Sequence, residues 1–181
     1  MDEYNKISNL DELMDWMDNN IKYGYIDING NIHDNELQGL RELFITRDAK
    51  SAVESGYGTC IEQAKIIDEK LKQFGYETYT YCSSSGPLNA LITDHSARMH
   101  SFILAVKDNK CVYFEHANTQ RRGIHNFDSI DQAIDFIKGV YKDNEYFVLH
   151  LTGYIPEGLN FDQLVNYVNI AEIVNINNKS K

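Results

Sequence analysis

Gly58-Thr59-Cys60-Ile61-Glu62-Gln63 is the stretch that decides the fold, because it opens a helical pattern that runs to Phe74. Thr59 is a good N-cap, and Glu62 three residues later completes a capping box, so the start of the helix is well specified. Cys60 then occupies the first turn, where unpaired backbone N–H groups and the helix dipole favour an anion. We therefore expect its thiol to ionise more readily than that of a free cysteine.

A structural role is the alternative interpretation of Cys60. The residue shares one helix face with apolar side chains at four-three-four-three spacing, namely Ala64, Ile67, Leu71 and Phe74. A cysteine on such a face is usually a small hydrophobe packed in the core. A role as nucleophile therefore depends on partners supplied from elsewhere in the chain.

The chain has 181 residues, which suits a single domain whose core is large enough to need no metal and no disulfide. Its 17 basic and 27 acidic residues give a net charge of −10, which argues against nucleic acid or an anionic membrane as the main partner. No apolar run approaches the length of a membrane span. A monomer is compatible with this composition.

The three cysteines are too few and too unpatterned for a disulfide framework or a zinc site. The first six residues also lack the basic and then apolar order of a signal peptide, so we expect a cytoplasmic protein. The alternation of Asp27, Asn29 and Asn31 resembles the start of an EF-hand loop. Ile32, however, stands where that loop needs a glycine. Gly-rich nucleotide loops are absent too, so the sequence predicts no metal and no cofactor.

The sequence predicts a single domain with three parts. Residues 1–55 form an N-terminal helical part, residues 56–151 form the candidate catalytic core, and residues 152–181 form a C-terminal extension. In the N-terminal part, the pattern predicts a helix from Ser8 or Asn9 to Ile21, a tight turn at Asn29-Gly30, a helix from Asn35 to Phe44 and a short helix within 46–58. After the Cys60 helix it predicts a strand (76–82), a polar loop (83–98), two strands (100–106 and 111–117), a helix (129–141), a buried strand (145–151) and a last helix (161–168).

The two strands at 100–106 and 111–117 read as a hairpin joined by Lys107-Asp108-Asn109-Lys110. If its loop has two or four residues, Phe102 lies opposite Glu115, and His100 points to the same side of the sheet as Glu115. His100 and Glu115 are then diagonal neighbours, with Cβ atoms roughly 7–8 Å apart, which two polar side chains can bridge. His116 falls on the opposite face. A three-residue loop would shift this register.

A cysteine at a helix N-terminus, a histidine at the start of a later strand and an acid on the next strand make a nucleophile, a base and an orienting group. This order resembles the transglutaminase-like superfamily, within the papain-like cysteine peptidase fold. The similar elements are Gly58-Thr59-Cys60, His100 and Phe114-Glu115-His116. The chain also resembles small uncharacterised bacterial members of that superfamily, which share these stretches and Ile21-Lys22-Tyr23-Gly24.

The resemblance implies an α+β fold in which the nucleophile helix packs on an antiparallel sheet. It implies Cys60 as nucleophile, His100 as base and Glu115 as the third member, where aspartate is commoner. The implied activity is thiol-dependent acyl transfer on amide bonds of a peptide or protein, without a cofactor. A cysteine peptidase is the leading form, ahead of a transglutaminase or deamidase.

One position departs from the papain pattern. Papain-type enzymes place a glutamine six residues before the cysteine as an oxyanion donor, whereas this chain has Glu54 there. An ionised acid cannot donate, so the second donor must come from Tyr57, Trp16, Tyr23 or another backbone N–H. Glu54 and the acidic composition motivate a different class of function, a catalytically silent papain-like module that binds a protein partner. A small-molecule amidase is a further alternative.

Overall fold

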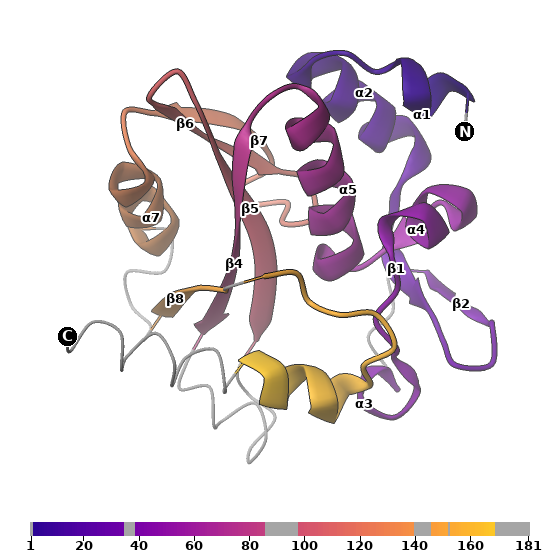
Figure 1. Ribbon diagram of the computed structural model, residues 1–181. Coiled ribbons are helices and arrows are strands. Elements are labelled where there is room, and N and C mark those ends of the chain that lie inside the picture. The colour runs from indigo at the N-terminus through magenta and orange to yellow at the C-terminus, as the bar shows by residue number, and fades with distance from the viewer. Residues whose placement is uncertain (1, 35–38, 86–97, 140–145, 152, 169–181) are drawn as a thin grey trace.

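The computed structural model describes residues 2–34, 39–85, 98–139, 146–151 and 153–168. They form an α+β fold in which a five-stranded antiparallel sheet carries helices on both faces, together with a smaller three-stranded sheet (Figure 1). The expected α+β class is confirmed. No helix within these ranges is long and apolar enough to cross a membrane.

The large sheet has the strand order β7-β6-β5-β4-β8. Its strands are β4 (Glu77–Ser85), β5 (Met99–Lys107), β6 (Lys110–Glu115), β7 (Gly123–Phe127) and β8 (Tyr146–His150). The sequence pattern misses the edge strand β7, because its short run of mixed polar and apolar residues shows no alternation. The predicted polar loop is wrong for Ser83 to Ser85, because these residues pair within the sheet as the end of β4. Residues 86–97 of that loop lie outside the described residues.

The β5–β6 hairpin has the register that the sequence predicts. Ile103 lies opposite Phe114, and Lys107 lies opposite Lys110, so the loop consists of Asp108 and Asn109 alone. Both loop residues have positive φ angles, 52° and 59°, which is the backbone twist that a two-residue hairpin needs. The hairpin thus fixes which strand residues face each side of the sheet.

Two helices cover the two faces of this sheet (Figure 1). Helix α5 (Cys60–Gln73) packs on the face that includes Ile103, and α7 (Ile130–Gly139) packs on the face that includes Leu104. Consecutive residues of β5 therefore belong to different hydrophobic clusters, as strand alternation requires. Helix α5 begins and ends as predicted, with a capping box at Thr59 and Gly75 at a φ angle of 83°.

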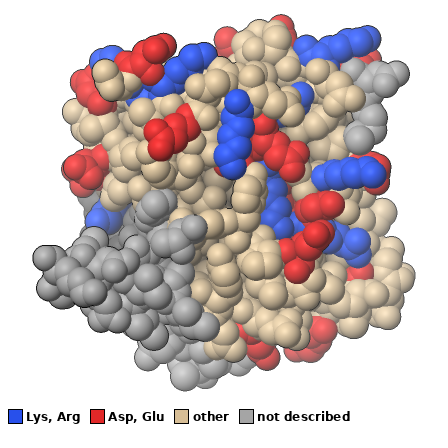
Figure 2. Space-filling view, viewed as in Figure 1, with Lys and Arg blue, Asp and Glu red and all other residues tan. Residues whose placement is uncertain are grey.

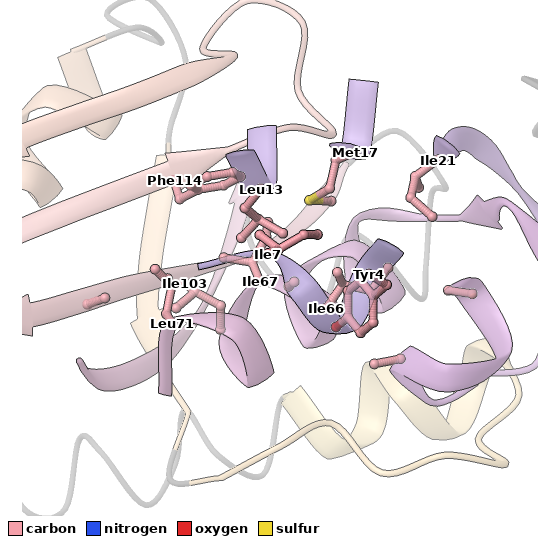
Figure 3. Close-up of a cluster of buried hydrophobic side chains, with 14 residues drawn as sticks. Tyr4, Ile7, Leu13, Met17, Ile21, Ile66, Ile67, Leu71, Ile103 and Phe114 are labelled. Carbon is pink, nitrogen blue, oxygen red and sulfur yellow. The ribbon is translucent and has the colours of Figure 1, made fainter. Parts of the chain in front are cut away.

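The N-terminal segment packs against α5. Helix α1 (Asp2–Lys6) is followed by α2 (Leu10–Asn20), whose N-cap Asn9 accepts a hydrogen bond from the backbone N–H of Glu12. Figure 3 shows the cluster that joins these helices to α5 and the sheet. Its labelled members are Tyr4, Ile7, Leu13, Met17, Ile21, Ile66, Ile67, Leu71, Ile103 and Phe114.

The small sheet brings an N-terminal strand beside the start of α5. Its strands are β1 (Lys22–Ile26), β2 (Ile32–Asp34) and β3 (Tyr57–Gly58), in the order β2-β1-β3. Strands β1 and β2 enclose the predicted Asn29-Gly30 turn, and β1 runs parallel to β3. The turn that precedes Cys60 is therefore supported by a strand more than 30 residues earlier in the sequence.

Two short helices connect the small sheet to α5. Helix α3 (Leu40–Leu43) is shorter than the predicted helix from Asn35 to Phe44, because Gly39 has a φ angle of 73° and cannot continue a helix. Residues 35–38 lie outside the described residues. Helix α4 (Ala49–Ser55) is the short helix predicted within 46–58, capped by Asp48 and ended by Gly56 at a φ angle of 75°. The predicted helix at residues 161–168 is also present.

Figure 2 shows the charged side chains on the face of the molecule seen in Figure 1. Acidic and basic groups are interspersed there among uncharged residues. Proteins that bind nucleic acid usually cluster their basic side chains on one surface. Among the residues drawn in colour, this face has no such continuous basic surface.

Candidate active site

The first turn of α5 is held by a buried carboxylate. Glu62 Oε2 accepts hydrogen bonds from the backbone N–H of Thr59 at 3.0 Å and from Thr59 Oγ1 at 2.5 Å. The other oxygen, Oε1, accepts from the backbone N–H of Arg47 at 3.0 Å. The predicted capping box is thus confirmed, and it also ties the helix to the segment before α4.

The Gly58–Thr59 peptide is fixed at both of its polar atoms. The side-chain Nε2 of Gln63 donates to the carbonyl oxygen of Gly58 at 2.8 Å, while the N–H of Thr59 donates to Glu62. A Cβ atom at position 58 would come within 3.0 Å of Glu62 Cβ, so this close approach favours glycine. The peptide that leads into Cys60 therefore has one orientation.

His100 and Glu115 meet as the hairpin geometry predicts. Nε2 of His100 lies 2.7 Å from Oε2 of Glu115. Glu115 is buried and also accepts hydrogen bonds from Tyr113 Oη at 2.5 Å and from the backbone N–H of Asn118 at 2.9 Å. Burial by itself would raise the pKa of Glu115, but the His100 charge and these three donors lower it to about 2. The carboxylate is therefore ionised near neutral pH.

The structure also brings Cys60 to His100. Burial by itself would lower the pKa of His100, but the Glu115 charge and hydrogen bonds with the Cys60 and Glu115 side chains raise it to about 10. The Cys60 side chain is therefore close enough to His100 to influence its charge. Cys60 itself is 7% exposed and belongs to the buried cluster that includes Tyr25 and Cys82. An imidazolium between a sulfur and a carboxylate can stabilise a thiolate and later transfer a proton.

His116 lies outside this contact and has partners of its own. Its Nδ1 lies 2.7 Å from Gln63 Oε1, and its Nε2 lies 3.0 Å from Arg122 Nη2 and 3.1 Å from Asp18 Oδ1. Because Gln63 uses its amide nitrogen to donate to Gly58, its oxygen must accept, so Nδ1 of His116 carries the proton. Burial lowers the pKa of His116, against a smaller opposing effect of the Glu115 charge.

Sequence reasoning excluded His116 as the partner of His100 but missed its contact with Gln63. That contact joins residues 53 positions apart and leaves no local pattern. The usable signal was a glutamine in the first turn of α5, next to the candidate nucleophile and on a helix surface that is almost entirely buried. A buried amide needs partners for both its donor and its acceptor, so its presence there calls for a hydrogen-bond chain.

Three of the residues considered as oxyanion groups lie away from the thiol. Glu54, at the position of the papain glutamine, lies on the exposed surface of α4, with its Oε1 3.8 Å from Lys50 Nζ. The Tyr57 hydroxyl lies 3.4 Å from Asp34 Oδ2, and Trp16 packs on Tyr4. Glu54 therefore does not occupy the role that its sequence position suggests.

Of the oxyanion candidates, Tyr23 lies beside the turn that precedes Cys60. It lies opposite Gly58 in the β1–β3 pair and is partly exposed. The charge of Cys60 is the largest influence on its phenol and raises its pKa, followed by burial and by the charges of Glu62 and Glu115. The Tyr23 hydroxyl thus stays protonated near neutral pH.

In the segment that resembles an EF-hand loop, the Asp27 carboxylate accepts hydrogen bonds from its own hairpin. Asp27 Oδ1 accepts from the backbone N–H groups of Asn29 at 2.8 Å and Asn31 at 2.9 Å, and Oδ2 lies 3.1 Å from Nε2 of His33. Within the described part of the chain, no group of three or more His, Cys, Asp or Glu residues is placed to hold a metal ion. Asp27 therefore stabilises the turn.

A shallow hollow lies between α5, the large sheet and the segment around residues 154–155. Ile61 and Ser101, the chain neighbours of Cys60 and His100, are among its lining residues. The side chains of the three candidate catalytic residues do not line it. It therefore flanks the candidate site and assigns no substrate to it.

Comparisons with known proteins find no family model, no curated protein and no solved structure that matches the chain. His100 lies between Glu115 and the Cys60 side chain, an arrangement that a thiol nucleophile with a base and an orienting acid would require.

Proposed function

We propose that this chain catalyses thiol-dependent acyl transfer on amide bonds, most simply as a cysteine peptidase acting on a peptide or protein. Cys60 is the nucleophile, His100 the general base and acid, and Glu115 the group that orients and charges the imidazole. The contact of 2.7 Å between His100 Nε2 and Glu115 Oε2, with the Cys60 side chain close enough to His100 to raise its pKa, carries the proposal. A helix that starts at the thiol and packs on an antiparallel sheet also supports a papain-like, transglutaminase-like core.

The first half of the proposed reaction acylates the enzyme. The Cys60 thiolate attacks the carbonyl carbon of the amide, a C–S bond forms, and the carbonyl π electrons move to oxygen. The backbone N–H of Cys60 donates to this oxyanion. As the C–N bond breaks, the His100 imidazolium gives its proton to the leaving amine, so a neutral amine departs and a thioester remains.

The second half releases the acyl group. Neutral His100 takes a proton from water, the hydroxide attacks the thioester carbonyl, and the C–S bond breaks to give an acid and the thiolate. Replacing water by a primary amine gives transamidation, as a transglutaminase does, and a glutamine side chain with water gives deamidation. The same three residues serve each of these outcomes, and hydrolysis of a peptide bond is the one we propose first.

Selective alkylation tests the nucleophile. Iodoacetamide at pH 6, followed by peptide mass spectrometry, is expected to modify Cys60 on the order of 100-fold faster than Cys82 or Cys111, because its thiolate is paired with an imidazolium. The other two thiols are matched internal controls. Burial raises the pKa of Cys111 to about 11 and, together with the Cys60 charge, raises that of Cys82 above its usual range. Equal rates at the three positions contradict the proposal.

The burial of Cys60, which is 7% exposed, favours a second candidate from another class. In this alternative the chain is a catalytically silent module of papain-like form that binds a protein partner. The same experiment separates the two functions. A silent module leaves Cys60 unmodified in the native protein and modified only after unfolding in urea, whereas an active thiol reacts in the native state.

A further inference from the structure

We propose that Tyr23 is the second oxyanion donor of this site, its phenol hydroxyl donating a hydrogen bond to the carbonyl oxygen as Cys60 attacks. The inference rests on the proposed role of Cys60 and supplies the donor that Glu54 cannot. Tyr23 is then a catalytic residue, because it touches the reacting atoms. Its contribution appears only when negative charge develops on oxygen.

The position of Tyr23 follows from strand pairing. β1 and β3 run parallel, with Tyr23 opposite Gly58, two residues before Cys60. Side chains two positions apart on a strand point to the same side, so Tyr23 and Tyr25 share one face of β1. Tyr25 packs in the buried cluster that contains Cys60, and this places the Tyr23 ring on the same side, toward the start of α5.

The hydroxyl of Tyr23 is also available as a donor. Among the described residues none forms a hydrogen bond with it in the resting structure, in contrast to Tyr57, whose hydroxyl lies 3.4 Å from Asp34. The negative charges around it, from Cys60, Glu62 and Glu115, keep the phenol protonated. A protonated phenol can donate to an oxyanion that forms near the sulfur.

Two reagents separate a role on the oxyanion from a role on the thiolate. Iodoacetamide alkylates the sulfur by displacement of iodide and forms no oxyanion. p-Nitrophenyl acetate acylates the same sulfur through a tetrahedral oxyanion, which collapses to expel p-nitrophenolate and leave an acetyl thioester. Both reactions need only the Cys60 thiolate, so they are measurable without the natural substrate.

The test compares wild type with Tyr23→Phe, which removes one oxygen atom and keeps the ring. Alkylation of Cys60 at pH 6 is expected to stay within about twofold, while acylation is expected to slow by about tenfold or more. Tyr57→Phe is the matched control, because it removes a hydroxyl from the neighbouring strand position and is expected to change neither rate. A thermal melt confirms that both variants are folded.

The outcomes are distinct. If both rates fall together in Tyr23→Phe, the hydroxyl supports the thiolate and the proposal is overturned. If neither rate changes, the second donor lies elsewhere and the proposal is overturned as well. If Cys60 of the wild type reacts no faster than Cys82 and Cys111 with either reagent, the proposed function itself fails.

Discussion

His100 and His116 lie at the same end of the hairpin, His116 buried and His100 with 15% of its side chain exposed, and their pKa values shift in opposite directions. His100 faces the carboxylate of Glu115, which raises its pKa to about 10 despite burial. At His116, Gln63 contacts Nδ1, Arg122 and Asp18 contact Nε2, and burial lowers the pKa. The difference teaches that the partners of His100, above all the charge of the Glu115 carboxylate, outweigh burial, whereas burial prevails at His116.

The two charge states suit two different tasks. In the proposed mechanism a charged His100 stabilises an anion at Cys60, which is the chemical requirement of a nucleophile. A neutral His116 donates to Gln63, which in turn fixes the carbonyl of Gly58, so it orders the turn before Cys60. Glu115 and His116 are adjacent in the chain and point to opposite faces of the sheet. One short segment therefore supplies the partner of His100 on one face and the partner of Gln63 on the other.

The largest effect is expected from Glu115→Gln, which gives His100 an amide partner like that of His116. With the carboxylate gone, burial dominates, and the pKa of His100 should fall below its usual value of 6.5, as measured by NMR titration. The imidazolium beside the sulfur is then largely lost at pH 7, and alkylation of Cys60 by iodoacetamide at that pH should slow on the order of 100-fold. An unchanged His100 titration in this variant would show that Glu115 does not set its charge.

Gln63→Glu is the reciprocal change and places a carboxylate at Nδ1 of His116, whose Nε2 already lies 3.1 Å from Asp18. The pKa of His116 should rise, because the new charge favours the imidazolium. The variant also loses the donor to the Gly58 carbonyl, so the turn loosens and alkylation of Cys60 should slow by about tenfold, less than in Glu115→Gln. If His116 titrates as in the wild type, the comparison of the two histidines is wrong.

The stability of the fold should depend on the two histidines with opposite signs. The pKa of His100 is raised from 6.5 to about 10, so its contribution is fully present below pH 6.5 and is lost as the pH rises through about 10. The pKa of His116 is lowered from 6.5, so its contribution is present above pH 6.5 and is lost as the pH falls through its folded value.

Melting temperatures of His100→Gln and His116→Gln from pH 5 to pH 10 measure both contributions. The deficit of His100→Gln relative to wild type should shrink toward pH 10, and that of His116→Gln should shrink toward pH 5. Each variant serves as the control for the other, since all other titrating groups are shared. Changes of a few degrees are expected, because about 1 kcal/mol shifts Tm by about 2–4 °C in a chain of this size. If the loss of melting temperature changes with pH in the same direction in both variants, the two histidines do not have opposite charge states.

The parts of this site that local chemistry specifies were predictable from the sequence. The capping box involves residues three positions apart, and the Asp108-Asn109 turn sets the hairpin register, so the start of α5 and the His100–Glu115 contact follow from short segments. Strand alternation then predicted that the side chains of His116 and Glu115 point to opposite faces of the sheet. The catalytic roles themselves stay predictions until the thiol is tested.

The parts that depend on distant partners were not predictable. The contact between Gln63 and His116 and the parallel pair of β1 with β3 join segments whose spacing carries no signal. The sequence excluded Glu54 as an oxyanion donor by its charge, but its position relative to Cys60 could not show that α4 turns this side chain to the surface. These contacts depend on which distant segments pack together in the fold, and the local sequence pattern does not show this.

The smallest effect is expected from Tyr113→Phe, which removes one donor from Glu115 and keeps the charge on which the His100 state depends. Tyr113 Oη lies 2.5 Å from the Glu115 oxygen that also contacts His100, so its loss leaves that buried oxygen with one side-chain partner. We expect a loss of about 1–2 kcal/mol in the free energy of unfolding, measured by urea denaturation, because a buried hydrogen bond to a charged group is broken. Alkylation of Cys60 should change by less than about threefold, because the Glu115 carboxylate still sets the charge of the imidazole. A loss of reactivity as large as that of Glu115→Gln would mean that the position of the carboxylate, and not its charge, is what distinguishes His100 from His116.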